Sequence, residues 1–194
     1  MGFTTMNHVV LYEPEIPGNT GNIIRTCMAT GSILHLIEPL GFRVDDKSLK
    51  RAGMDYVRST DIHTYKNWED FLAKNPNATK DTMYFLTRYG HRAPAEFDYS
   101  DVSHDYFFVL GKESTGIKKE ILIEHLEHCM RLPMKEDARS LNLSNCAAIM
   151  VYEALRQQNY PGLSHDEYLK GPEYLEQIRQ ELQDKIALEA TKQD

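Results

Sequence analysis

The sequence predicts an α/β fold with a mostly parallel β-sheet flanked by helices. Short runs of β-branched and aromatic residues alternate with segments of helical apolar spacing, which is the order found in parallel sheets with crossover helices. The runs are followed by loops and not by hairpin signals, and the run YFFVL at Tyr106–Leu110 is typical of a buried strand. With 194 residues, 41% of them hydrophobic, the chain is long enough for one such domain and a short appendage.

The first part of the chain contains a strand, a helix and a second strand. His8–Tyr12 (HVVLY) is a β-branched and aromatic run that the prolines and glycine of Glu13–Gly18 must stop. Apolar residues then recur at helical spacing over Asn19–Ala29, and Gly31 is suited to end that helix. We expect the second strand at Ile33–Ile37.

The middle of the chain continues this alternation with shorter elements. Two short helices are predicted at Asp45–Ala52 and Asn67–Lys74, each with a residue suited to cap its start. Besides Tyr106–Leu110, the buried strands are predicted at Met83–Leu86 and, last and shortest, at Cys129–Leu132.

Two further helices complete the prediction. Asn142–Gln158 carries apolar residues around nearly its whole circumference, so it must be covered on more than one side. Beyond Tyr160 the composition turns polar, and Pro172–Ala190 is predicted as a helix with one apolar stripe, packed on its own domain or on a partner subunit. We therefore expect a main domain over 1–160 and a helical extension over 161–194.

The composition excludes several classes of protein. No apolar stretch approaches the ~20 residues of a membrane span, and the start lacks the features of a signal peptide.

Cys27, Cys129 and Cys146 form no Cys-x-x-Cys pair, which favours the reducing cytoplasm over a disulfide framework. The run His125–Cys129 places possible metal ligands close together, but a helix end explains it better than zinc. The net charge of -7 disfavours binding of nucleic acid by bulk charge but permits a local basic site.

Loops that follow predicted strands hold the unusual residues, at the edge where open parallel sheets bind ligands. In the first loop, Asn19–Arg25 (NTGNIIR), Asn19 and Asn22 by themselves favour a turn and a helix cap. Arg25 is expected in the first turn of the helix, where a cation opposes the helix macrodipole. Its presence there indicates a nearby anion or polar substrate, with a plain surface arginine as the alternative.

Two more loops that follow predicted strands also contain residues suited to binding a ligand. In Gly111–Gly116 (GKESTG) the glycines permit close approach of the backbone to a ligand and Glu113 can accept amide bonds, although an ordinary turn explains this loop when it is taken alone. The third stretch, Leu132–Asn145, holds more polar groups than one helix cap requires. No G-x-G-x-x-G follows the first strand and no P-loop is present, which excludes the usual dinucleotide and P-loop phosphate sites.

Four motifs in order resemble those of the SPOUT superfamily of S-adenosylmethionine-dependent RNA methyltransferases. They are NTGNIIR (Asn19–Arg25), LGKESTG (Leu110–Gly116), LPM (Leu132–Met134) and RSLNLSN followed by VYEALRQ (Arg139–Gln157). The stretch YEPEIPGNTGN makes the chain similar, within the superfamily, to the tRNA 2′-O-methyltransferases that act on the wobble nucleotide. The joint order and spacing is specific, whereas each motif alone is weak.

The resemblance implies a fold and a cofactor. The fold is the SPOUT or α/β knot, in which the C-terminal part of the domain is threaded through a loop as a trefoil knot. The protein would be a homodimer that binds S-adenosyl-L-methionine in the knot and needs no metal. Carried over residue by residue, the cofactor-binding residues would be Leu86, Gly111, Leu132, Met134, Ser140, Leu141 and Asn142. Supporting residues would be Asn19, Asn22, Glu113, Ser144 and Asn145.

The implied reaction is attack of a ribose 2′-hydroxyl on the methyl group of a sulfonium, which depends mainly on positioning. By similarity, Arg25 would lie at that hydroxyl, reaching across the dimer. Because arginine stays protonated at neutral pH, we interpret it as a phosphate clamp and a stabiliser of the developing alkoxide, with the proton acceptor left open. Tyr152 is the second catalytic candidate, and a core tyrosine is its equal alternative.

The resemblance also implies tRNA, through its anticodon stem-loop, as the partner. Five cations close in sequence are expected to help bind it, although a solvated helix face explains them too. Other functions stay open at this stage: a methyltransferase of the same superfamily acting on another tRNA position or on ribosomal RNA, and a catalytically idle RNA-binding dimer. The five cations are Arg43, Lys47, Lys50, Arg51 and Arg58.

Overall fold

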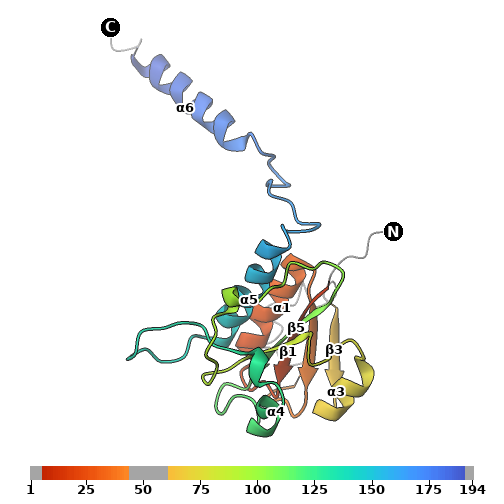
Figure 1. The fold of residues 1–194 in the computed structure, drawn as a ribbon. Coiled ribbons are helices and arrows are strands. Elements are labelled where there is room, and N and C mark those ends of the chain that lie inside the picture. Colours follow the sequence, from red (N-terminus) through yellow and green to blue (C-terminus); the bar gives the residue numbers. More distant parts are fainter. Residues whose placement is uncertain (1–5, 44–60, 191–194) are drawn as a thin grey trace. The chain divides into compact units, whose positions relative to one another are not determined.

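The computed structural model of the chain describes residues 6–43 and 61–190 (Figure 1). The chain divides into two compact units, Met1–Pro161 and Gly162–Asp194. No helix within the described ranges is both long and apolar enough to cross a membrane. Outside the described residues lie the helix predicted at Asp45–Ala52 and the cations Lys47, Lys50, Arg51 and Arg58.

A six-stranded parallel sheet forms the centre of the first unit. Its strand order is β3-β2-β1-β5-β4-β6, and all five pairings between neighbours are parallel. The two central strands, β1 and β5, are buried at every position, which is why their sequences are apolar without alternation. The predicted parallel sheet is confirmed. The strands are β1 (Asn7–Tyr12), β2 (Ile33–Ile37), β3 (Ile62–Tyr65), β4 (Met83–Leu86), β5 (Tyr106–Gly111) and β6 (Cys129–Met130).

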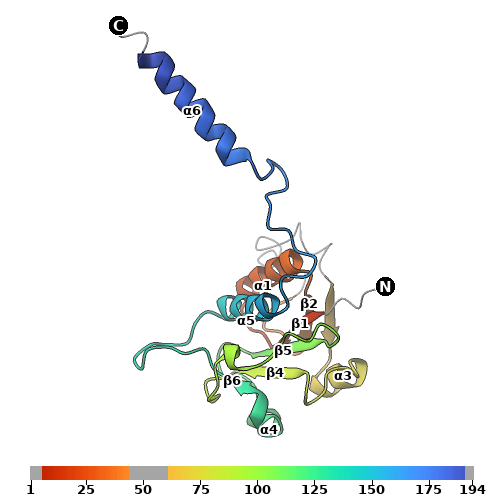
Figure 2. The same cartoon turned by 45° about the horizontal axis from the view of Figure 1, so that its top comes forward.

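Helices cover both faces of this sheet (Figure 2). On one face α1 (Pro17–Thr30) and α5 (Leu143–Gln157) pack against each other, and together they contact β1, β2 and β5. On the other face lie α3 (Trp68–Lys74) and α4 (Lys119–Ile123), whose apolar residues join one core cluster. Helix α5 is therefore covered on two sides within its own chain. Two short 3-10 helices, η1 (Pro94–Glu96) and η2 (Leu126–His128), complete the unit.

The core on the α3 face is largely aromatic. Side chains alternate between the two faces of each strand. Tyr12 of β1, Phe85 of β4 and Phe107 of β5 all lie on this face, in one core cluster. Phe71 of α3 is fully buried and meets the Phe107 ring edge-on, with 6.1 Å between centroids. The helix that carries Phe71 begins at Asn67, whose side chain accepts a bond from the N–H of Asp70 at 2.8 Å. The helix predicted over this segment is thus present, with Asn67 as its N-cap.

The second unit contains helix α6 (Tyr174–Ala190), close to the predicted Pro172–Ala190. Its apolar stripe remains exposed, at 74% for Leu175, 55% for Leu182 and 67% for Ile186. The residues between the stripe positions are mostly polar or charged, among them Glu176 in the first turn.

Some elements differ from the sequence prediction. Strand β3 was not predicted because its four residues (IHTY) form the sheet edge and only Tyr65 is buried, so it lacks a buried-strand signal. Helix α4 was missed because five residues are too few for a helical period. The last strand ends at Met130 and not at Leu132, since its partner β4 ends at Leu86, which pairs with Met130.

Helix α1 begins two residues earlier than predicted, with Pro17 in its first turn. The predicted stop is confirmed, because Gly31 ends the helix in the left-handed conformation at φ 68°. Arg25 consequently lies in the middle of α1, and the inference that it opposes the macrodipole from the first turn is wrong. Asn19 is not a helix cap either, because Ile16 occupies that position and Asn19 is buried inside the first turn.

A hydrogen-bonded row of buried side chains crosses three strands beneath α3. His8 Nδ1 lies 2.8 Å from His35 Nε2, and His35 Nδ1 lies 2.8 Å from the Tyr65 hydroxyl. The bond between the rings needs one ring nitrogen without a proton, so both rings cannot be charged. Burial lowers the pKa of His8 to about 4 and that of His35 to about 3. The folded protein therefore keeps both histidines neutral.

We expect the free energy of unfolding to fall as the pH drops from about 6.5 toward about 4. In this range the two histidines bind protons in the unfolded chain, where the pKa is 6.5, but not in the folded one. His35→Asn should be less stable at pH 7.5 and should lose part of this pH dependence, as measured by urea unfolding monitored by circular dichroism. His104→Asn, which removes an exposed histidine, serves as the control. A pH dependence unchanged in His35→Asn would contradict the assignment.

Candidate functional site

At the carboxyl ends of β4 and β5, three loops enclose a cavity of about 640 Å³. This is the edge at which open parallel sheets bind ligands, and the volume lies within the usual range for small-molecule sites. The sequence motifs converge here although they are far apart in the chain. All residues predicted to bind the cofactor line the cavity: Leu86, Gly111, Leu132, Met134, Ser140, Leu141 and Asn142.

The loop after β5 is a tight turn whose backbone forms part of the cavity wall. Gly116 donates its N–H to the carbonyl of Lys112 at 2.9 Å and has a φ of 75°, which favours glycine. A Cβ on Gly111 would lie 2.3 Å from the carbonyl carbon of Gly116. No side chain can occupy position 111 without displacing this backbone, so the glycines at both ends of the turn are required by its geometry.

One chain of hydrogen bonds joins the three loops. Glu113 Oε1 accepts a bond from Asn19 Nδ2 at 2.8 Å, and Asn19 Oδ1 accepts one from Asn142 Nδ2 at 2.9 Å. Asn142 Oδ1 in turn accepts bonds from the N–H and the hydroxyl of Ser144, at 2.9 and 2.6 Å, which makes Asn142 the N-cap of α5. The second carboxylate oxygen of Glu113 accepts the N–H of Glu15 at 2.9 Å. This chain fixes the starts of α1 and α5 to the loop after β5.

Two further contacts bind the loop after β1 to the loop after β5. Glu15 accepts bonds from the N–H and the hydroxyl of Ser114, at 2.9 and 2.8 Å. The ammonium group of Lys112 lies 2.7 Å from Glu13 Oε2. Burial raises the pKa of Glu13, but the bonds from Lys112 and Tyr12 and the nearby positive charges together outweigh it, so the pKa is lowered. Neither contact was predicted, because an ion pair between residues 99 apart leaves no local signal.

Several predicted site residues lie away from the cavity of their own chain. Arg25 and Asn22 are exposed on α1, and Tyr152 and Asn145 are exposed on α5. Tyr152 is 47% exposed, so the core-tyrosine alternative is wrong. The single chain thus brings together the predicted cofactor residues but not the two predicted catalytic residues.

The cavity also includes residues that the sequence reasoning missed. Thr87, Arg88 and Tyr89 continue directly from β4, and Arg131 follows β6. Their position in the sequence could have identified them, because residues just beyond the carboxyl ends of parallel strands lie at the edge of the sheet where ligands bind. Two of the missed residues are cations, which makes the mouth of the cavity more basic than the overall charge suggests.

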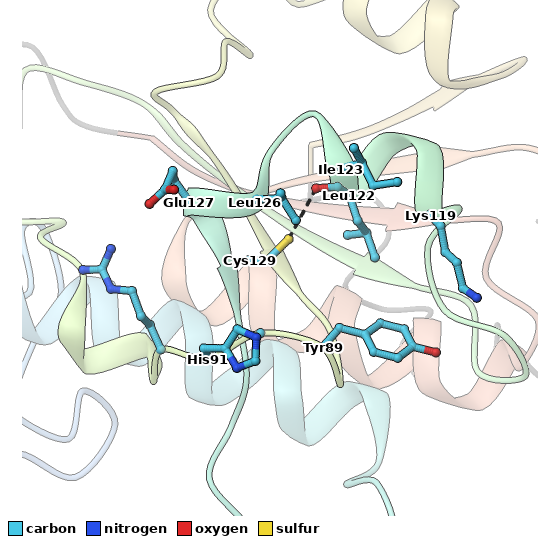
Figure 3. A pocket seen from close by; sticks show the side chains of 10 residues that line it. Tyr89, His91, Lys119, Leu122, Ile123, Leu126, Glu127 and Cys129 are labelled. Carbon is cyan, nitrogen blue, oxygen red and sulfur yellow. Dashed lines mark hydrogen bonds between the residues drawn. The ribbon is translucent and has the colours of Figure 1, made fainter.

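The run His125–Cys129 does not form a ligand cluster. The His125 ring stacks on Phe85 with 4.5 Å between centroids, whereas the thiol of Cys129 lies 3.7 Å from the carbonyl oxygen of Leu122 (Figure 3). Within residues 6–43 and 61–190, no three His, Cys, Asp or Glu side chains are placed to hold a metal ion.

Comparisons with known proteins give one family. Residues 6–152 match the model of the SpoU rRNA Methylase family. A relative from Geobacillus stearothermophilus is 54% identical over 157 residues, which cover 81% of this chain and 98% of the relative. A relative from Saccharophagus degradans, a tRNA (cytidine(34)-2′-O)-methyltransferase, is 43% identical over 159 residues, or 81% of this chain and 99% of the relative.

Solved structures agree with this assignment. One described as giving structural insights into 2-OH methylation of cytidine or uridine 34 on tRNA has a TM-score of 0.71 and 35% identity, covering 80% of this chain and 97% of its own. An AdoMet-bound rRNA methyltransferase from Sinorhizobium meliloti has a TM-score of 0.68 and 29% identity, covering 78% of this chain and 56% of its own.

We expect Gly111→Ala to destabilise the protein by about 1–3 kcal/mol, because the added methyl group would overlap the backbone of Gly116 and force the turn open. Urea unfolding measures this loss. Gly18→Ala is a matched control, since Gly18 lies in α1 with open space around its Cβ position, and this substitution should be neutral or slightly stabilising. Equal stability of the two variants would show that the turn tolerates a side chain.

Proposed function

The chain belongs to the SpoU rRNA methylase family, and on that premise we propose that it methylates the ribose 2′-hydroxyl of the wobble nucleotide, cytidine or uridine 34, of tRNA. The methyl donor in this proposal is S-adenosylmethionine. The observation that carries it is the convergence of the four sequence motifs on one cavity at the carboxyl edge of the sheet. The relatives with this activity in their names support the choice of tRNA position 34.

The proposal assigns a methyltransferase domain to residues 1–160 and a helical extension to residues 161–194, in keeping with the division of the chain into two units. It includes a trefoil knot in the C-terminal part of the domain. The topology supports this, because α5 follows the edge strand β6 in sequence but contacts the central strands β1 and β5. The chain must therefore cross back past β4 and its loop before α5 begins.

The residues of the cavity fit S-adenosylmethionine. Leu86, Leu132 and Leu141 offer apolar cover for a flat adenine, while the turn at Gly111 and the hydroxyl of Ser140 offer polar partners. Leu86, Gly111, Leu132, Met134, Ser140, Leu141 and Asn142 would hold the molecule. Bound there, it supplies an electrophilic methyl group on a sulfonium, and its transfer to a hydroxyl requires no metal.

The supporting residues keep the loops in place before substrate binds. Glu113, Asn19, Asn142 and Ser144 form a continuous chain of hydrogen bonds, which would limit reorganisation of the cavity walls. Asn22 and Asn145 are exposed near the starts of α1 and α5 and would support the site from its surface. Catalysis would then come mainly from positioning of the ribose hydroxyl.

Arg25 is proposed to act at the ribose of the substrate bound to the other subunit of a homodimer. It is exposed on α1 and does not line the cavity of its own chain, which is consistent with action on a neighbour. As a permanent cation it would bind phosphate and stabilise the developing alkoxide. Tyr152, exposed on α5, is the second candidate and would bond the substrate through its phenol.

The dimer is supported by a small apolar face on α5. Ile149 is 42% exposed and Tyr152 is 47% exposed, and their spacing of three places them on one side of the helix. Val151 and Leu155 are buried within their own chain, so most of the apolar circumference of α5 is covered without a second copy. In the proposed dimer, a second copy covers this exposed face of α5.

The partner in this proposal is the anticodon stem-loop of tRNA. Arg43 is the one member of the predicted basic group within the described residues, and it is exposed. A tRNA substrate places the enzyme in the cytoplasm, and the three cysteines, all unpaired within the described ranges, are compatible with that compartment.

Methyl transfer from labelled S-adenosylmethionine to unmodified tRNA, followed by mapping of ribose methylation, tests the function. We expect methylation at position 34 of tRNA, unchanged by a chelator. Methylation elsewhere in tRNA or in ribosomal RNA would replace the substrate assignment. RNA binding without any transfer would favour an idle RNA-binding dimer.

In the same assay, Arg25→Ala should lower the rate of transfer on the order of a hundredfold or more. Its affinity for S-adenosylmethionine, measured by calorimetry, should stay normal because Arg25 does not line the cavity. Arg179→Ala, which removes an exposed cation of α6, is the control. Near-normal turnover together with lost cofactor affinity would contradict the role of Arg25.

The dimer is tested with two charged substitutions on α5. Ile149→Glu places a charge on the exposed face and should give a folded but inactive monomer, because Arg25 no longer reaches the neighbouring cavity. Val151→Glu buries an unpaired charge and should instead unfold the chain. Light scattering and circular dichroism distinguish these outcomes. A wild-type protein that is monomeric yet fully active would refute the shared site.

A further inference from the structure

We infer that Tyr89 is a base-stacking residue at the centre of an RNA-binding surface beside the cavity, an inference that rests on the proposed function. Tyr89 is 57% exposed, and it lines three adjoining hollows. These are the cavity of the proposed methyl donor, an apolar groove of about 520 Å³ along α4 and η2, and a smaller hollow beside Lys112 and Lys118. Tyr89 is therefore within reach of an RNA strand that binds at the cavity.

The backbone under Tyr89 is fixed although its side chain is exposed. Thr87 donates its N–H to the carbonyl of Met130 at 2.9 Å, and Arg131 donates its N–H to the carbonyl of Arg92 at 2.9 Å. Between these bonds, a Cβ on Gly90 would lie 2.3 Å from the carbonyl carbon of Met130, so the segment lies directly on the end of β6. A ring on such a backbone binds a base with little loss of backbone freedom.

The groove next to Tyr89 is apolar and open to solvent. Ile123 is 64% exposed and Leu126 is 65% exposed, and both line it together with Leu122. In Figure 3 the Tyr89 ring and the Lys119 side chain lie at the same end of the groove, and both residues also line the smaller hollow. An exposed apolar patch with a polar rim indicates a binding surface, and unpaired nucleobases have the flat apolar faces that would fill it.

The charges around Tyr89 identify the partner as a polyanion. The protein as a whole carries -7, but the acidic side chains in the walls of the three hollows are only Glu113 and Glu127. The carboxylate of Glu113 is already bonded to Asn19 and to the N–H of Glu15. A cationic rim around an aromatic ring is the arrangement that binds single-stranded nucleic acid. The cations in these walls are Arg88, Arg92, Lys118, Lys119 and Arg131, together with Lys112, whose charge is already paired with Glu13.

These observations assign the surface to the RNA segment that flanks the methylated nucleotide. One base stacks on Tyr89, the next enters the groove of Ile123 and Leu126, and the cations contact the phosphates. This arrangement holds the RNA strand while the target ribose lies in the cavity. Binding through this local surface needs no net positive charge on the whole protein, which explains how an acidic protein can bind tRNA.

The test compares Tyr89→Ala, Tyr89→Phe and the control Tyr168→Ala, which removes an exposed tyrosine of the second unit. RNA affinity is measured by fluorescence anisotropy with a labelled anticodon stem-loop, and S-adenosylmethionine affinity by calorimetry. Tyr89→Ala should weaken RNA binding by about 5- to 150-fold, the range for loss of one base stack. Tyr89→Phe keeps the ring and should bind like wild type. In Tyr89→Ala the loss of RNA affinity should be much larger than any loss of S-adenosylmethionine affinity, because the ring forms only part of the cavity wall, and Tyr168→Ala should change neither affinity.

Two substitutions probe the rest of the surface in the same assay. Leu126→Glu should weaken RNA binding by placing a negative charge in the groove, whereas Leu182→Glu on α6 should not. Lys119→Ala should lower the slope of log affinity against log salt by about 0.7 to 1, the effect of one phosphate contact. RNA affinity that is unchanged in Tyr89→Ala would overturn the inference, and so would a matching loss of cofactor affinity. If wild type methylates no RNA, the proposed function itself fails, and the two failures are therefore distinguishable.

Discussion

The hydrogen-bonded chain from Glu113 through Asn19 to Asn142 is the constraint on which the site depends. Loops at the end of a sheet have no ladder to hold them, so their polar groups must find partners in each other. Here one carboxylate and two amides link the starts of α1 and α5 to the loop after β5. Removing one member would leave partly buried donors or acceptors of the others unsatisfied, which costs about 1–3 kcal/mol for each group. The chain therefore joins the cavity walls into a single unit.

The loops are also held by contacts where backbones touch. Gly111 lies against Gly116, and Gly90 lies against Met130, each too close for a Cβ. The first contact fixes the turn after β5, and the second holds the loop after β4 against the end of β6. Side-chain hydrogen bonds join the loops to one another, and the glycine contacts fix the backbone of the loops after β5 and β4. A site that depends on positioning more than on acid–base chemistry needs both, because small displacements of reacting groups cost large factors in rate.

The sequence predicted the parallel sheet because buried strands and helix caps have local signals, whereas the cofactor residues of the cavity were predicted only from the resemblance of four motifs to a known superfamily. Buried runs such as Tyr106–Leu110 and cap residues such as Asn142 are visible within a few positions. The edge strand β3 has no such signal, since its middle residues are exposed. The bond between Asn19 and Glu113 joins positions 94 apart, so the sequence favoured a helix cap for Asn19 when it is in fact a buried link. Tyr89 was missed for a related reason, because an exposed tyrosine after a strand acquires meaning only from the three hollows around it.

Helix α5 connects the two halves of the proposed mechanism. Its N-cap, Asn142, belongs to the hydrogen-bonded chain at the cavity, and its exposed face carries Ile149 and Tyr152. Between these ends the helix is buried against the sheet and α1 by Ala147, Met150 and Val151, so it cannot shift without disturbing the core. A second subunit docked on the exposed face would thus act on a rigid element that begins in the cavity wall. The same packing that stabilises the domain would therefore give the partner subunit a fixed position relative to the cavity. A catalytic arginine that acts across the interface requires such a fixed position.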